Sequence, residues 1–446
     1  MRKLSFHVIG TIVLSVLIVC IALGGGYQLN EQGARAVGMG GAFVARASDP
    51  SAIYFNPAGM TSLKGINVLG GFNLIMPSST FKGVGVMQPV EASAKSQVFT
   101  PINVYGTYQA NDRVTVGLGI YNPYGLGTEW DNLWGPALNG AYLGSMKSVK
   151  ADIATWYFNP SFALKINDQL SVGWGVSYVY ATVTLTKNPL GIPTSLMEMT
   201  GTGKGWNANF GATYKPMDKL SIGLSYRAST NIEFTGDLKF SGMNVHIPGL
   251  PATYTYALLF PGGTGKATLP LPANLQVGAA YEIMPELTVE GDFQFVQWSA
   301  YKQLSIAITP PVIIPLPPPY PTLVGQGTIT QDKNWDDGFL LRAGAEYKYN
   351  ADITLRGGLI LDLTPQPASK TEPMLPDADR TDITLGGSYK INDNLSVDAS
   401  YMLVLFAEKN AASSNPTGSS SSSIGGVPGV YNSTAHIFSV NVGYAF

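Results

Sequence analysis

A short polar turn followed by an apolar residue, a serine or threonine and a second apolar residue recurs along this 446-residue chain. The six copies of this pattern begin at Asn111, Asn167, Pro216, Met284, Asn350 and Asn392. Each turn stands between segments in which apolar and polar residues alternate, as expected for a tight hairpin between antiparallel strands. Longer stretches rich in glycine, proline and serine separate the copies, for example residues 308–327 and 413–429. The chain is therefore constrained to a meander of β-strands.

The alternation indicates that one face of the sheet meets lipid. In residues 436–446 every second residue after His436 is apolar or aromatic, and small or polar residues lie between them. Such a face is required in a membrane, where unpaired polar groups are costly. Only 13% of the residues are charged, and no apolar run beyond residue 23 is long enough for a membrane helix. We therefore expect an all-β fold, a transmembrane antiparallel β-barrel.

The turns also give the number of strands. In outer-membrane barrels the short turns face the periplasm and the long loops face outwards. With both chain ends in the periplasm, six short turns imply about fourteen strands. The lumen of such a barrel is wide enough to need filling. Residues 25–63 do not alternate and are rich in small residues, so we expect them to form an N-terminal hatch inside a barrel of residues 64–446.

The first residues resemble a secretory signal. Met1, Arg2 and Lys3 precede an apolar run over residues 4–23, and three glycines follow at 24–26. This order predicts a signal peptide over residues 1–24, with a single membrane anchor as the alternative. The alternating segment ending at Phe446 resembles the signal that the barrel insertion machinery reads. We expect a multi-pass protein of the Gram-negative outer membrane.

Charge and histidine content argue against other functions. A net charge of -2 offers no general attraction to nucleic acid. An outer-membrane phospholipase would need a serine and a histidine held together, but signal removal leaves only His246 and His436, neither of which has a serine at suitable spacing. Neither histidine has a second metal ligand nearby. We expect no enzyme activity, no metal and no cofactor.

Motifs spread along the whole chain resemble those of the FadL family of outer-membrane transporters, which includes the TodX proteins. These motifs are residues 26–31, residues 48–52, Asn56-Pro57-Ala58-Gly59, Asn122-Pro123-Tyr124-Gly125 within residues 122–130, and residues 159–161, 166–173, 271–275 and 375–380. The resemblance implies a monomeric, passive channel that works without ATP. It further implies that a hydrophobic ligand moves from an outer groove to a lumen pocket and leaves sideways through a gap at a kink in the third strand.

The resemblance puts two motifs on the substrate path. They are Asn56, Pro57 and Ala58 in the hatch, and Asn122, Pro123, Tyr124 and Gly125 at the kink. Aromatic residues in the predicted outer loops are candidates for the outer groove, although such residues also lie at lipid headgroups. These candidates are Phe81, Trp130, Trp134 and Tyr142.

Two further groups of charged residues are candidates for specific roles. The segment containing Pro376, Asp377, Asp379 and Arg380 is either a substrate site or a loop held to the barrel by charge-assisted hydrogen bonds, and the second reading is favoured. The hairpin that turns at Asn350 and Ala351 places Glu346 opposite Arg356 on the polar face of neighbouring strands. We expect these two side chains to form an ion pair in the lumen.

The sequence leaves the substrate open. Long-chain fatty acids and monoaromatic hydrocarbons are both compatible with the family resemblance. Fatty acids are favoured only because they are the more common substrates in the family. A structural or adhesive barrel is the alternative suggested by the long proline-rich and serine-rich loops. The expected partners are a hydrophobic small molecule, outer-membrane lipid, lipopolysaccharide and the insertion machinery.

Overall fold

The computed structural model describes residues 25–138, 141–142, 149–247, 255–258, 261–310, 313–314, 323–324, 327–411 and 427–446. The predicted signal peptide, residues 1–24, lies outside this range. No helix within the described ranges is long and apolar enough to cross a membrane.

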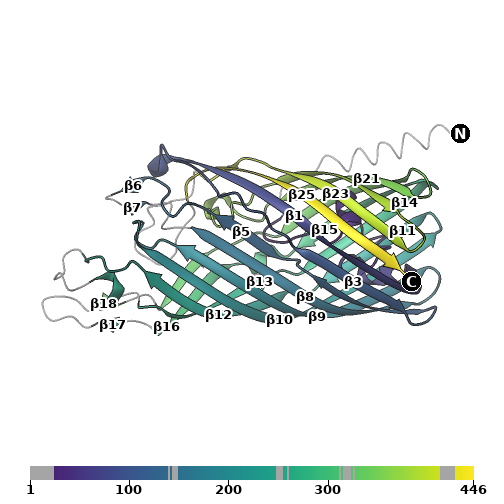
Figure 1. Ribbon diagram of the computed structural model, residues 1–446, viewed down its shortest axis with the longest axis horizontal. Coiled ribbons are helices and arrows are strands. Elements are labelled where there is room, and N and C mark those ends of the chain that lie inside the picture. Colours follow the sequence, from purple (N-terminus) through teal and green to yellow (C-terminus); the bar gives the residue numbers. More distant parts are fainter. Residues whose placement is uncertain are drawn as a thin grey trace.

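The chain folds into a closed antiparallel barrel of 14 strands (Figure 1). Several barrel strands are interrupted and carry two labels. Around the wall the strands are β1 (Ile66–Gly83), β3 (Ile102–Gln109), β4 (Val114–Tyr121) with β5 (Gly125–Glu129), β8 (Lys150–Lys165), β9 (Leu170–Lys187), β10 (Leu196–Met217), β11 (Leu220–Arg227) with β12 (Thr230–Ser241), β13 (Gly263–Leu271) with β14 (Asn274–Met284), β15 (Leu287–Val296) with β16 (Gln303–Thr309), β19 (Thr328–Asp332) with β20 (Gly338–Lys348), β21 (Ile353–Leu363), β22 (Arg380–Lys390), β23 (Leu395–Phe406) and β25 (Gly429–Ala445). β25 pairs with β1 and closes the wall. The predicted fold and strand number are confirmed.

Short elements belong to the outer loops. They are β2 (Glu91–Ser93), β6 (Ala137–Leu138), β7 (Ala141–Tyr142), β17 (Ile313–Ile314), β18 (Leu323–Val324) and β24 (Lys409–Asn410), with the 3-10 helices η3 (Gly85–Met87), η4 (Tyr256–Leu258) and η6 (Ala368–Lys370). A further 3-10 helix, η5 (Trp298–Ala300), interrupts the wall between β15 and β16. In Figure 1, β6, β7, β17 and β18 lie at the end opposite the C-terminus.

Asparagine side chains shape several of the tight turns at the other end. Asn111 Oδ1 accepts hydrogen bonds from the backbone N–H groups of Arg113 and Val114, at 2.9 and 3.0 Å. Asn167, Asn350 and Asn392 make the same pair of bonds in their own turns. An asparagine that bonds its own backbone two residues on favours a turn. The predicted hairpins therefore form where these residues occur.

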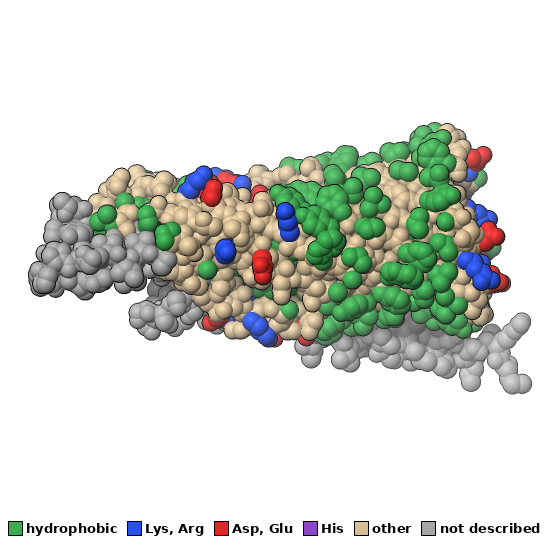
Figure 2. Space-filling model, turned by 90° about the horizontal axis from the view of Figure 1, so that it is seen from below, with side chains coloured by type: hydrophobic (Ala, Val, Ile, Leu, Met, Phe, Trp, Pro, Cys, Tyr) green, Lys and Arg blue, Asp and Glu red, His purple; other side chains and the backbone are tan. Residues whose placement is uncertain are grey.

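The two faces of the wall differ as the alternation predicted. On β10, Trp206, Phe210 and Tyr214 are exposed, whereas Asn207 and Asn209 are buried towards the lumen. On the face seen in Figure 2, apolar side chains gather in a broad band over the half of the barrel that carries the tight turns. This band is the lipid-facing surface.

Residues 25–63 precede β1 and lie against the inside of the wall. They form α2 (Ala34–Gly38), α3 (Ala52–Phe55) and η2 (Pro57–Ser62). α2 contacts β21, β22 and β23, while η2 contacts β8, β9 and β10. Gly40 has a φ of +64°, and a Cβ there would lie 2.9 Å from the backbone nitrogen of Leu359, so the small residues permit this close approach. The division of the chain at residues 24 and 63 remains a prediction.

Candidate functional site

The barrel contains an apolar pocket, here called the lumen pocket, and a larger space, the wall cavity. The lumen pocket has a volume of about 60 Å³ and is lined by Tyr27, Leu126, Ala151, Ile153, Val183, Leu185, Met199, Phe234, Ala267, Leu269, Tyr301, Leu304, Lys333, Trp335, Glu372, Met374 and Leu375. The wall cavity has a volume of about 330 Å³, and its lining includes Leu29, Phe99, Asn122, Gly125, Trp156, Ile360 and Arg380. Leu126 and Ile153 line both spaces.

The lumen pocket holds a buried ion pair among apolar side chains. Lys333 Nζ donates to Glu372 Oε1, and the exposed fractions of the two side chains are 5% and 8%. Gln331 donates to the other oxygen of Glu372. Burial raises the pKa of Glu372, but Lys333 and Lys187, together with these hydrogen bonds, outweigh that effect and leave the pKa below its usual value. Glu372 is therefore ionised at neutral pH and neutralises Lys333.

Trp335 and Trp298 also bring unused hydrogen-bond donors to this region. The indole Nε1 atoms of both residues are buried and have no acceptor within the described part of the chain. Trp335 lines the lumen pocket, and its ring centroid lies 5.3 Å from that of Trp298. A buried N–H without an acceptor is costly and calls for an explanation.

Hatch residues 27–29 stand between the two spaces. The Tyr27 ring lies on the lumen-pocket side, 4.6 Å from Trp298 and 6.0 Å from Tyr301 between centroids. Gln28 and Leu29 line the wall cavity. Gly26 has a φ of +61°, and a Cβ there would lie 2.5 Å from the Trp298 ring. This short segment thus has the lumen pocket on one side and the wall cavity on the other.

The wall is interrupted beside residues 122–125. β3 pairs with β4 as far as Asn103 and Tyr121, but β5 pairs only with β8. Asn122 bridges the break, because its Oδ1 accepts from Ile102 N at 2.8 Å and its Nδ2 donates to Thr155 O at 2.6 Å. Pro123 lacks a backbone N–H and cannot extend the ladder. The third strand is therefore interrupted at residues 122–124, and the wall cavity lies beside this break.

Phe99 and Gly127 face each other across this break. A Cβ on Gly127 would lie 1.8 Å from the Phe99 ring. Phe99 forms only an isolated bridge with Ile75 of β1. Trp156, which alternates with the buried Tyr157 on β8, also borders the cavity. Residues from the lumen and from the outer side of β8 thus line a single space.

The hatch motif lies elsewhere on the wall. Asn56 is fully buried, and its Nδ2 donates to Val44 O at 2.7 Å and to Ala212 O at 3.0 Å. Its Oδ1 accepts from Ala58 N at 3.1 Å. Pro57 packs against Gly173 of β9. Asn56, Pro57 and Ala58 therefore fasten the hatch to β9 and β10 and do not line the wall cavity.

Three of the predicted groove aromatics form a packed cluster in the outer loops. Phe81, Trp130 and Trp134 are buried with Tyr431, and the centroids of Phe81 and Trp134 are 5.4 Å apart. Trp130 Nε1 donates to Pro373 O at 2.9 Å. Trp134 borders an outer cavity that Glu91, Ser93 and Asp131 also line. The Tyr142 side chain lies outside the described residues.

The loop before β22 is tied to the start of the hatch. Asp377 Oδ2 accepts from Gly26 N at 3.1 Å and from Thr364 Oγ1 at 2.6 Å. Asp379 Oδ1 accepts from Thr364 N at 2.9 Å. Arg380 pairs with Asp362 and borders the wall cavity, and Pro376 is buried beside Asp377. Burial raises the pKa of Asp377.

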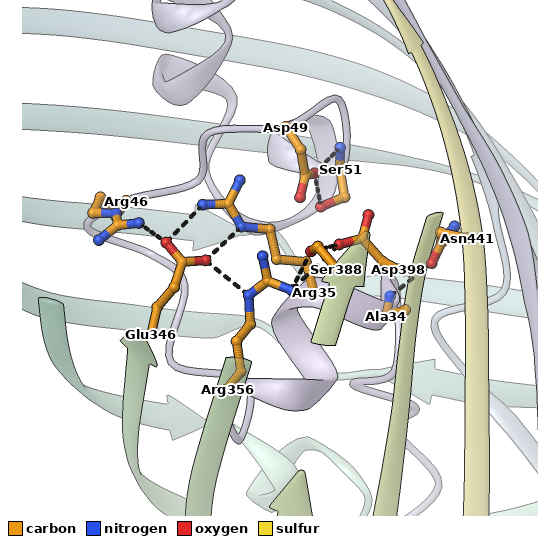
Figure 3. Close-up of polar contacts among 10 residues, drawn as sticks. All are labelled: Ala34, Arg35, Arg46, Asp49, Ser51, Glu346, Arg356, Ser388, Asp398 and Asn441. Atoms are coloured by element: carbon orange, nitrogen blue, oxygen red, sulfur yellow. Dashed lines mark hydrogen bonds and ion pairs between the residues drawn. The ribbon is translucent and has the colours of Figure 1, made fainter. Parts of the chain in front are cut away.

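Glu346 and Arg356 face each other as the hairpin register places them (Figure 3). Arg356 Nε lies 2.7 Å from Glu346 Oε2. Arg35 and Arg46 of the hatch also pair with Glu346, and Arg356 reaches Asp398 at 3.3 Å. Glu346 therefore joins the hatch to the wall, which the register of the hairpin alone does not reveal.

Known proteins resemble this chain over nearly its whole length. Residues 15–446 match the family model described as outer membrane protein transport protein (OMPP1/FadL/TodX). The long-chain fatty acid transport protein of Escherichia coli O6:H1 is 27% identical, covering 90% of this chain and 92% of the relative. Outer membrane protein P1 of Haemophilus influenzae is 25% identical over 100% of both chains.

Solved structures share the fold. A FadL homologue of Pseudomonas aeruginosa superposes with a TM-score of 0.76 at 20% identity, covering 94% of this chain and 99% of that one. The toluene transporter TodX of Pseudomonas putida superposes with a TM-score of 0.69 at 16% identity, covering 96% and 99%. The protein is an outer-membrane transport barrel for hydrophobic compounds, and not an enzyme. The chain belongs to the OMPP1/FadL/TodX family of outer membrane transport proteins.

Proposed function

We propose that this protein is a passive channel for long-chain fatty acids, which leave the barrel sideways. The ligand occupies the lumen pocket, passes hatch residues 27–29 and moves through the wall cavity beside Asn122 and Gly125 into the membrane. No energy source is needed, because each step transfers apolar surface from one apolar environment to another. The small volume of the lumen pocket, about 60 Å³, implies that the ligand displaces side chains or the hatch segment when it binds.

The polar groups in the lumen pocket favour an acid over a hydrocarbon. Burying the Lys333–Glu372 pair among apolar side chains carries a desolvation penalty, and an aromatic hydrocarbon could not use either charge. A fatty acid that enters as the neutral acid can give its proton to Glu372 and place its carboxylate at Lys333, so that one negative charge still faces the lysine. This carboxylate can also accept from the free N–H of Trp335. The choice of substrate rests on one observation: a tryptophan with a free N–H and a lysine line the same apolar pocket.

A structural or adhesive role has less support. The serine run of residues 419–423 and most of the proline cluster at residues 310–321 lie outside the described residues, so the structure offers no argument for adhesion. Monoaromatic hydrocarbon uptake remains the second candidate, because the toluene transporter TodX shares the fold.

Trp335→Phe tests the choice of substrate with little disturbance to packing. It keeps an aromatic ring and removes the N–H, so the Kd for oleate should rise about tenfold while toluene uptake stays unchanged. The double change Lys333→Met with Glu372→Gln removes the ion pair without leaving one buried charge, and should weaken oleate binding at least as much. Lys302→Met, at an exposed lysine, is the control. Unchanged oleate binding with lost toluene uptake would favour the hydrocarbon channel.

A further inference from the structure

The strands of one side of the barrel continue beyond the lipid-facing band. On β10 the outward residues are apolar from Tyr214 to Trp206 and then change to Lys204, Thr202 and Thr200. The inward residues change in the opposite sense, since Asn207 and Asn209 give way to Met199 and Met197. The outer face of this extension is therefore polar, and its inner face lines the lumen pocket.

Threonine dominates this outer face, here called the threonine face. Strand register places Thr182 of β9, Thr202 of β10 and Thr235 of β12 in one row. The next row contains Thr184 and Thr200, and Thr264 and Thr268 continue the face on β13. Thr200, Thr202, Thr235 and Thr268 are exposed. In Figure 2 the surface between the apolar band and the outer loops carries scattered side chains of both charges among uncharged ones.

The charges on this face are balanced. The outward residues carry three lysines and three carboxylates, namely Lys204, Lys239, Lys266, Glu198, Glu233 and Asp237. Lys204 lies directly opposite Glu233. A surface without net charge does not select a polyanion by charge alone. The hydroxyl groups therefore distinguish this face, and threonine holds them in few rotamers because its Cβ is branched.

The height of the threonine face above the apolar band indicates which part of the membrane it contacts. Trp206 packs against Tyr178, and Trp156 against Tyr180, at the upper edge of the apolar band. Such aromatic residues mark the level of the lipid headgroups. Thr202 lies four residues further along β10, which is roughly 10 Å above Trp206 for a tilted strand. In the outer leaflet of a Gram-negative membrane, that level is occupied by the phosphorylated sugars of lipopolysaccharide.

We propose that the threonine face binds the inner sugars of lipopolysaccharide. The fixed hydroxyl groups exchange hydrogen bonds with sugar hydroxyls. Lys204 meets a phosphate group at the border with the apolar band, and Lys266 meets one in the row of Thr202 and Thr235. The face continues the surface that already meets the acyl chains, so one lipopolysaccharide molecule contacts both. The ligand path stays separate, because Val183, Met199 and Phe234 point to the other side of the same strands.

Native mass spectrometry of the purified barrel in detergent tests this binding. The probes are lipid A carrying inner-core sugars and the same lipid A without them. The triple variant Thr200→Val, Thr202→Val and Thr235→Val keeps branched side chains and removes three hydroxyls. We expect it to bind the sugar-bearing lipid at least fivefold less, and lipid A alone less than twofold less.

The control variant carries Thr80→Val, Thr381→Val and Thr434→Val, which are exposed threonines on β1, β22 and β25. It should bind both probes like the wild type. Equal binding of the sugar-bearing lipid by the two variants would overturn the proposal, as would an equal loss of both probes. Loss of a dimer in place of lipid would assign the face to a second copy of the barrel. If the triple variant yields no folded barrel, Thr202→Val alone should show a twofold loss.

Discussion

Glu346 is a single acceptor shared by three arginines, two from the hatch and one from β21. Removing one partner of a buried ion pair leaves an uncompensated charge and costs several kcal/mol. Glu346→Ala leaves Arg35, Arg46 and Arg356 close together without this carboxylate, so we expect a loss of about 3 kcal/mol in the free energy of unfolding. Arg356→Ala should cost less, because Glu346 keeps the two hatch arginines.

The double variant Glu346→Ala with Arg356→Ala completes the cycle. Urea unfolding in detergent should give a coupling energy of about 1 kcal/mol or more between the two sites. Additive losses would contradict the pairing. Lys390→Ala, which removes an exposed pair with Asp393 at a tight turn, is the control and should have little effect.

Asp377 gives a pH dependence at the loop that holds Gly26. Its pKa is raised by burial, so the folded protein binds this proton more tightly than the unfolded chain does. The free energy of unfolding of the wild type should therefore rise, relative to that of Asp377→Asn, as the pH falls from 7 towards 4. Urea midpoints measured across this range provide the comparison. The raised pKa would be contradicted if the free energy of unfolding of the wild type, minus that of Asp377→Asn, stayed constant or fell as the pH was lowered.

At the residue scale, the sequence predicted contacts within a hairpin but missed those made by the hatch. Glu346 and Arg356 occupy opposite ladder positions, and turn geometry fixes that register. Arg35 and Arg46 reach Glu346 from about 300 residues away, and a segment without periodicity does not reveal which wall strand it touches. Lys333, Glu372 and Trp335 were missed for the same reason, since they come from loops and strand breaks.

Among the elements, the hatch motif offers the clearest test. Asn56 donates to carbonyl groups of the hatch and of β10, and the change of Asn56 and Pro57 to alanine leaves both acceptors without that donor. This should cost about 1–3 kcal/mol of local stability and loosen the hatch. We expect lower oleate uptake with unchanged barrel yield and heat-modifiable gel mobility. Asn67→Ala, at a half-buried asparagine whose side chain donates to Lys64 O outside the hatch motif, is the control. Equal loss of folded barrel would make Asn56-Pro57 a folding motif.

The alternation of apolar and polar residues predicted the strands and turns. It did not predict that the wall continues beyond the lipid-facing band. Within the lipid band an apolar residue faces outwards, whereas beyond Trp206 the apolar residues of β10 face inwards. If every apolar residue is assigned to the lipid side, the inward and outward residues of β10 beyond Trp206 are therefore predicted the wrong way round. The breaks at η5 and between β11 and β12 were also missed, because a short interruption resembles continued alternation.

For the whole molecule, the exit route can be tested at the wall. A Cβ on Gly125 would lie 3.0 Å from Leu29, so Gly125→Phe should narrow the wall cavity and leave the lumen pocket largely unaltered. Oleate uptake should fall severalfold while oleate still binds the purified barrel. Gly106→Phe is a matched control on the neighbouring β3, because a Cβ there meets open space. Uptake that is unaffected by Gly125→Phe would place the exit elsewhere.

Closure of the barrel has a consequence for how the protein assembles. β1 and β25 pair from Asn67 with Ala445 to Gly83 with Gly429, which joins the two ends of the barrel sequence. Contacts between such distant segments form late and slowly in folding. Until they form, β1 and β25 each have an unpaired edge that can pair with another chain. Because α2 and η2 contact strands on opposite sides of the barrel, we expect the hatch to dock before β1 and β25 pair. We also expect the insertion machinery to shield β25 until the hatch has docked.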